Sequence, residues 1–103
     1  MQSAVSSANG AAILTLTAPT DATKRRAFDA LHWSYSATPT GGRLQITSGT
    51  QPSYDVDITA GGPGYLAFPP SFRGQAGQTV VVTLAAGGAS VVGKVNVPND
   101  WVE

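Results

Sequence analysis

The stretch 78–98 constrains the fold more than any other part of the chain. It holds two runs rich in β-branched residues on either side of the turn sequence Ala-Ala-Gly-Gly at 85–88. β-Branched residues favour strands, and paired glycines reach the positive φ angles that hairpin turns require. The pattern predicts a β-hairpin at the end of the chain.

The rest of the sequence repeats this pattern. Runs of Val, Ile, Thr and aromatic residues alternate with clusters of Gly, Pro, Ser and Asn, and no segment shows helix caps around an apolar stripe. With 103 residues and no cysteine, the chain is long enough for one core without disulfides. These features predict an all-β fold: a single antiparallel β-sandwich or jelly roll of about seven to eight strands. Strand spacing does not choose between a jelly roll and an immunoglobulin-like sandwich.

The chain is expected to consist of a flexible N-terminal arm at 1–10 and one β-sandwich domain at 11–103. The segment 60–77 contains five glycines and three prolines, so it is expected to be the longest irregular segment, and a functional one. Its prolines confine any strand at 65–68 to the edge or the end of a sheet. Further strands are expected at 11–18, 27–37, 43–47 and 54–58.

Alternation predicts which side chains face the core. In 54–58, Tyr54, Val56 and Ile58 should face inward, and the two aspartates between them should face water. In 27–37 the bulky side is expected to form the core face. That side holds Leu31, Trp33 and Tyr35, and the opposite side holds Phe28, Ala30, His32 and Ser34.

The charge balance argues against several classes of partner. Six basic and six acidic residues cancel, and only 12% of the chain is charged. Binding of nucleic acid through a basic face is therefore not expected. Residues 1–10 lack the features of a signal peptide, and no apolar run approaches the ~20 residues of a membrane span. A surface with so little charge is poorly protected against association, which favours a protein that lives in an assembly.

No catalytic or metal-binding pattern is recognisable. Asp55 and Asp57 lie about 7 Å apart on one face of a strand, which is typical of solvated positions and too little for a calcium site or a pair of catalytic acids. His32 is the only histidine and is interpreted as a partly buried structural residue. No serine stands in the Gly-x-Ser-x-Gly pattern. We therefore expect no enzyme, no metal and no cofactor.

Aromatic residues and arginines are the candidate binding residues. Protein interfaces favour this combination, sugar-binding modules use planar aromatic rings, and the same side chains could instead fold back to plug the end of the sandwich. A short basic run at 24–26 is either a solvated turn or a contact to an acidic neighbour. The candidate interface residues are Arg25, Arg26, Tyr65, Phe68, Phe72, Arg73 and Trp101.

Four short sequence blocks follow one another between Phe28 and Val97. They are the strand Trp-Ser-Tyr-Ser at 33–36, the turn Pro-Thr-Gly-Gly at 39–42, the strand Asp-Val-Asp-Ile at 55–58 and the closing Leu-Ala-Ala-Gly-Gly-Ala at 84–89. Through these blocks the chain resembles small all-β virion structural proteins of tailed bacteriophages, and among them a capsid decoration (cement) protein.

The resemblance implies a non-enzymatic protein, made in the host cytoplasm, that sits on the capsid surface of the virion. It would bind the major capsid protein as a trimer and stabilise neighbouring subunits through many weak contacts, with the N-terminal arm ordering on contact. The alternative is a carbohydrate- or receptor-binding β-sandwich of a phage tail or fibre. That alternative predicts a coplanar exposed set among Tyr35, Tyr65, Phe72 and Trp101.

Overall fold

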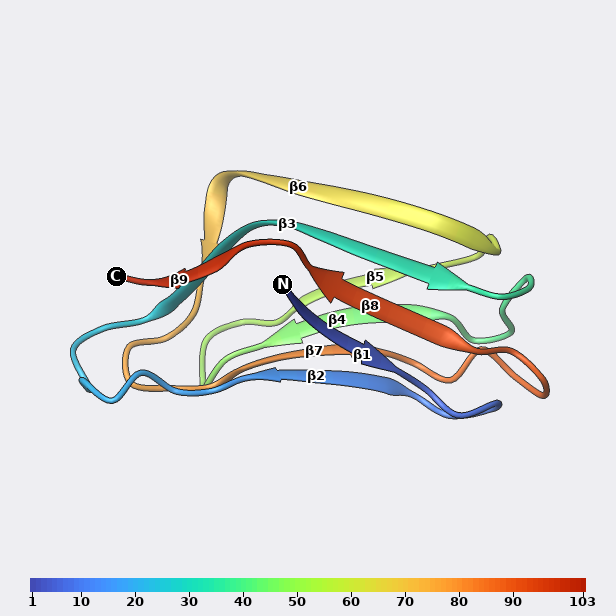
Figure 1. Cartoon of the computed structure of the whole chain (residues 1–103), viewed down its shortest axis with the longest axis horizontal. Helices are drawn as coiled ribbons and strands as arrows, with labels where there is room; N and C mark the ends of the chain where they lie inside the picture. The colour runs from blue at the N-terminus through green and yellow to red at the C-terminus, as the bar shows by residue number, and fades with distance from the viewer.

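The computed structural model describes all 103 residues and contains two antiparallel sheets and no helix (Figure 1). It therefore has no helix that could cross a membrane. Sheet A consists of β1 (Gln2–Val5), β8 (Gly93–Val97), β3 (Arg26–Tyr35) and β6 (Gly62–Arg73) in that order, with β9 (Asp100–Val102) paired to the start of β3. Sheet B consists of β2 (Ala12–Leu16), β7 (Val80–Leu84), β4 (Arg43–Thr47) and β5 (Tyr54–Asp57) in that order. The predicted all-β sandwich is confirmed, with nine strands.

The strand pairs are nested in the sequence. β1 pairs with β8, β2 with β7, β3 with β6 and β4 with β5. Only β4 and β5 are neighbours in the chain, so the molecule is one long hairpin rolled into two layers. This is the jelly-roll arrangement, which decides between the two sandwich types that the sequence left open.

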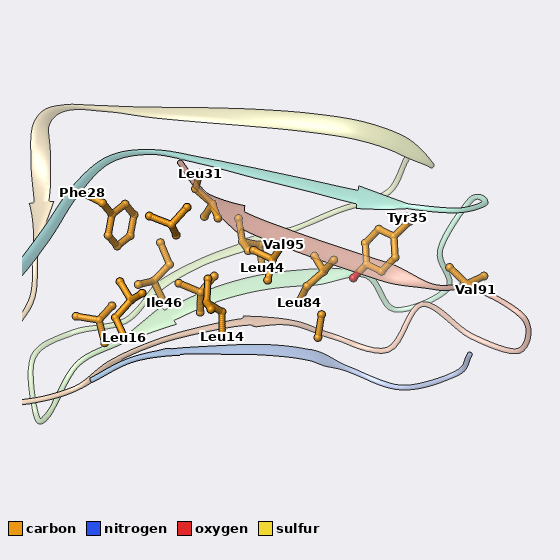
Figure 2. Close-up of a cluster of buried hydrophobic side chains, with 14 residues drawn as sticks. Leu14, Leu16, Phe28, Leu31, Tyr35, Leu44, Ile46, Leu84, Val91 and Val95 are labelled. Atoms are coloured by element: carbon orange, nitrogen blue, oxygen red, sulfur yellow. The ribbon is translucent and has the colours of Figure 1, made fainter. Parts of the chain in front are cut away.

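The core lies between the sheets, where alternate side chains of each strand point inward (Figure 2). In β2, β7 and β8 every second residue is buried, which is the pattern of a strand with one face on a core. The prediction for 54–58 is confirmed, because Tyr54, Val56 and Ile58 pack against this core and the aspartates between them are exposed. The buried core residues are Ala12, Leu14, Leu16, Phe28, Leu31, Tyr35, Leu44, Ile46, Val80, Val82, Leu84, Val91, Val95 and Val97.

The predicted hairpin at 78–98 is wrong, because β7 and β8 belong to different sheets. Each strand has one apolar face, and these faces pack against each other across the sandwich instead of lying side by side in one sheet. The turn sequence at 85–88 lies where the chain passes from β7 in sheet B to β8 in sheet A. A Cβ at Gly87 would lie 2.9 Å from the Cδ1 atom of Tyr35, so only glycine lets the chain pass this buried ring.

Phe28 was expected on the outer face of its strand, and this prediction is also wrong. The register between β3 and β6 shifts between Phe28 and Ala30, as in a β-bulge. From Phe28 to Ala30 β3 advances two positions, while β6 advances five, from Phe72 to Ala67. The extra residues therefore lie on β6, and they interrupt the regular alternation at this point of the pair. Phe28 is therefore fully buried, and Asp29 at the bulge is exposed.

The segment 60–77 is not the irregular segment that its glycines and prolines predicted. Residues 62–73 form β6, the longest strand of the protein with 12 residues. The expected edge position is confirmed, since β6 pairs only with β3. At an edge, Pro63, Pro69 and Pro70 can lack an N–H without removing a bond from the interior of the sheet.

The N-terminal residues expected to form a flexible arm contribute a strand. β1 pairs with β8 over four residues, from Gln2 opposite Val97 to Val5 opposite Lys94. The buried hydroxyl of Ser6 then accepts a hydrogen bond of 2.8 Å from the backbone N–H of Gly93. Residues 2–6 are thus part of the sandwich, which corrects the proposed boundary at residue 11.

We predict that Ser6→Ala lowers the free energy of unfolding by about 1–3 kcal/mol, because the buried N–H of Gly93 loses its side-chain acceptor. Ser7→Ala is the matched control, since Ser7 is exposed. Urea denaturation of both variants measures the difference. Equal stability of the two variants would show that this segment is an arm after all.

Tyr35 gives a second stability prediction. Its buried hydroxyl donates a hydrogen bond of 2.6 Å to the carbonyl oxygen of Ala85, and burial raises its pKa above the ordinary value near 10, partly opposed by the hydrogen bond from the Arg43 N–H. The contribution of the neutral phenol is therefore fully present below about pH 10 and is lost as the pH rises through the raised pKa. Tyr35→Phe should lower the free energy of unfolding by about 1–2 kcal/mol at neutral pH.

The same variant should also reduce the fall in stability above about pH 10, because phenylalanine does not ionise. Urea denaturation at neutral and alkaline pH tests both points. Tyr65→Phe, which changes an exposed ring, serves as the control. A loss of stability as large in the control as in Tyr35→Phe would contradict the role assigned to the buried hydroxyl.

Candidate functional site

The outer face of sheet A carries the most distinctive group of exposed side chains. Residues that alternate with the buried ones point away from the core, and the strand register arranges them in rows across the sheet. One row contains Tyr65 of β6, His32 of β3, Asn96 of β8 and Ser3 of β1. The neighbouring row contains Pro63, Ser34, Lys94 and Val5 on the same four strands.

A depression of about 440 Å³ lies on this face. We call it the Tyr65 depression. Part of its floor is the contact between β3 and β6, where Gly64 stands opposite Trp33. A Cβ at Gly64 would lie 2.2 Å from the indole of Trp33, so glycine is needed for this ring to pack beneath β6. The lining residues are His32, Trp33, Ser34, Pro63, Gly64, Tyr65 and Asn96.

Tyr65 projects from this face with 63% of its surface exposed. Its ring centroid lies 4.8 Å from that of His32, and the ring planes meet at 65°. Such an edge-to-face contact orients the tyrosine and leaves much of the ring open to solvent. The depression therefore presents an aromatic surface that is positioned before any ligand arrives.

The polar side chains around Tyr65 are free to bind a ligand. Those of His32, Ser34 and Asn96, and the hydroxyl of Tyr65, take part in none of the side-chain hydrogen bonds of the chain. An imidazole, a carboxamide and two hydroxyls can each donate and accept. The site thus combines one apolar ring with several unpaired polar groups.

Carboxylates are located elsewhere. Asp55 forms an ion pair with Arg43 on sheet B, and the hydrogen bond from that guanidinium holds the pKa of Asp55 below its ordinary value. Asp29 on sheet A accepts a hydrogen bond from the Ser71 hydroxyl. No group of three or more His, Cys, Asp or Glu side chains lies close enough together to hold a metal ion. The arrangement at Tyr65 is thus suited to binding, and it lacks the paired acids of glycoside hydrolysis.

Four of the predicted interface residues gather around β9, at the far end of sheet A from the Tyr65 depression. Arg26 forms an ion pair of 3.1 Å with Asp100, and Arg73 pairs with Glu103. Hydrogen bonds from Trp101 and then from Arg73 hold the pKa of Glu103 below its ordinary value. Arg25 and Glu103 exchange two backbone hydrogen bonds, of 2.9 and 3.0 Å. These residues hold the C-terminal strand in place.

Phe68 and Phe72 belong to an aromatic cluster with Phe28 and Tyr54. Their ring centroids lie 5.1–5.8 Å from their neighbours in the cluster, one pair stacked and three edge to face. Both residues are half-buried against the core, as the plug alternative predicts. Their part in a protein interface stays a prediction.

Of the predicted residues, only Tyr65 lines the depression. The coplanar aromatic set expected of a sugar platform is not formed, because Tyr35 is buried, Phe72 is stacked on Phe28 and Trp101 is half-buried beside Glu103. His32, expected to be partly buried, is exposed. Alternation within 93–97 could have placed Lys94 and Asn96 on an outer face, but not next to His32.

Comparison with known proteins adds to the description of the fold. No protein-family model matches the sequence, and no curated protein matches it. Among solved structures, the chain is similar to one described as Family 16 Carbohydrate Binding Module-2, with a TM-score of 0.54 and 11% identity over 96% of this chain and 74% of that chain.

Two further structures with more distant folds are TmCBM61 in complex with β-1,4-galactotriose and the carbohydrate-binding module CBM36 in complex with calcium and xylotriose. Their TM-scores are 0.39 and 0.38, their identities 9% and 12%, and they match 93% and 98% of this chain over 66% and 76% of their own. At 11% identity, the similarity to the first structure is a similarity of fold. The protein has a β-sandwich similar to that of a carbohydrate-binding module.

Proposed function

We propose that this protein is a non-catalytic carbohydrate-binding module and that it holds a saccharide in the Tyr65 depression. The observation that carries the proposal is the exposed ring of Tyr65, oriented by His32 and surrounded by the unpaired polar groups of Ser34 and Asn96. The likeness of the fold to a carbohydrate-binding module supports it.

The chemistry of the site matches that of a sugar. A saccharide has apolar C–H faces that pack on an aromatic ring, and hydroxyls that both donate and accept hydrogen bonds. Tyr65 supplies the ring, and His32, Ser34 and Asn96 supply partners for the hydroxyls. The volume of about 440 Å³ falls in the range of ligand sites, roughly 300–1,000 Å³.

The affinity of one site should be weak. Only one exposed ring stacks on the ligand, and each hydrogen bond made in the presence of water contributes about 0.5–1.5 kcal/mol. After the loss of translational and rotational freedom, we expect a Kd of about 0.1–1 mM. Useful binding would then come from several copies of the module on one particle or from a ligand with repeated units.

The resemblance to proteins of tailed bacteriophages supplies a proposed setting for this activity, a receptor-binding part of a tail or fibre. The second candidate function is that of a capsid decoration protein. The observation in its favour is the exposure of two apolar side chains, Val5 on the outer face of sheet A and Ile13 on the outer face of sheet B, either of which could contact an apolar partner surface. Light scattering of the free chain, and of capsids incubated with it, would reveal the trimer and the binding to the major capsid protein that this candidate requires.

We predict that Tyr65→Ala weakens saccharide binding at least tenfold, which corresponds to about 1.4 kcal/mol. The variant removes the stacking surface, and because the ring is exposed, the melting temperature should change little. Tyr65→Phe should keep most of the affinity. Isothermal titration calorimetry with an oligosaccharide selected on a glycan array measures all three proteins.

Ile13→Ala is the control for this experiment, because Ile13 is exposed to a similar degree on the outer face of sheet B. It should bind the oligosaccharide as the unchanged protein does. Unaltered binding by Tyr65→Ala would place the saccharide elsewhere on the molecule and overturn the proposed site.

A further inference from the structure

Lys94 lies next to the Tyr65 depression and forms no ion pair. It is exposed on β8, two residues from Asn96 and on the same face of the sheet. Across the strands its Cα pairs with Ser34 on one side and with Val5 on the other. Its ammonium group is therefore available at the rim of the site.

The register sets the separation between Lys94 and the aromatic ring. Tyr65 is two strands away, roughly 10 Å, and one row along, roughly 7 Å, so the Cα atoms are about 12 Å apart. The lysine side chain is long and flexible, and it can cover part of this distance. A short oligosaccharide that rests on Tyr65 would thus bring its next residue within reach of the ammonium group.

No carboxylate neutralises Lys94. The aspartates of β5 are on sheet B, Asp100 and Glu103 are paired with arginines around β9, and Asp21 is bound by Thr23 in the loop before β3. Asp29 is the only acid on β3, five residues before Ser34, which places it about 16 Å along the strand. This exceeds the screening length of roughly 8 Å at physiological salt.

We propose that the saccharide bound in the Tyr65 depression is anionic and that its acidic group, a carboxylate or a sulfate ester, pairs with Lys94. This inference rests on the proposed function and adds the class of sugar to it. His32, in the same site, can donate a hydrogen bond to such an acidic group. Because the pair would be exposed to water, its contribution is modest: a two- to fivefold gain in affinity.

The test compares the unchanged protein with Lys94→Gln on an array that holds neutral oligosaccharides, uronic-acid oligosaccharides and sulfated oligosaccharides. Titrations follow with the best acidic ligand and with its carboxyl-reduced or desulfated counterpart. We expect the acidic form to bind about two to five times more tightly at low salt, and Lys94→Gln to remove this preference. The two acidic arms distinguish a carboxylate from a sulfate.

Lys24→Gln is the matched control, because Lys24 is an exposed lysine that lies outside the Tyr65 depression. It should leave the preference unchanged, and melting curves should show both variants folded. An acidic preference that survives in Lys94→Gln, or equal binding of the acidic and neutral forms, would overturn this inference and leave carbohydrate binding in place. Absence of binding to any saccharide would overturn the proposed function, and this inference with it.

Discussion

Burial of one face of each of the strands β1 to β8 between the two sheets is the constraint on which the rest of the structure depends. Because side chains alternate along a strand, each residue that is buried decides where its neighbours point. Val95 and Val97 are fully buried, so Lys94 and Asn96 face outward. A slip of one residue in the register of β8 would move both polar side chains into the core and two valines onto the surface. The Tyr65 depression is thus a direct consequence of the core.

The nested strand pairing assembles the site from distant parts of the chain. β3 is the central strand of sheet A and pairs with β6, β8 and β9. It brings His32 beside Tyr65 on one side and beside Asn96 on the other. A site on the face of a paired sheet is rigid, and a rigid site loses little entropy when a ligand binds. The same strand anchors β9, which holds the arginines expected at an interface.

Local sequence patterns predicted what depends on local order, and failed where the outcome depends on pairing. The strict alternation at 54–58 and the prolines of β6 identified an inward face and an edge strand. The glycines at 87–88 indicated a turn, but nothing nearby could show that it leads to the opposite sheet. The register shift between Phe28 and Ala30, where β6 holds the extra residues, places Phe28 in the core. β1 was missed because it forms a strand only by pairing with β8, about ninety residues later in the chain.

The candidate site was the least predictable part, since its residues are neighbours only after the sandwich has formed. We have proposed that a saccharide rests on the outer face of sheet A. The most direct measurement is a ¹H–¹⁵N correlation spectrum of the labelled protein during titration with an oligosaccharide that it binds. We expect shifts centred on the amides of His32, Tyr65 and Asn96, while the amides of β7 on sheet B stay unmoved. Shifts confined to sheet B or to the strands around β9 would contradict the proposal.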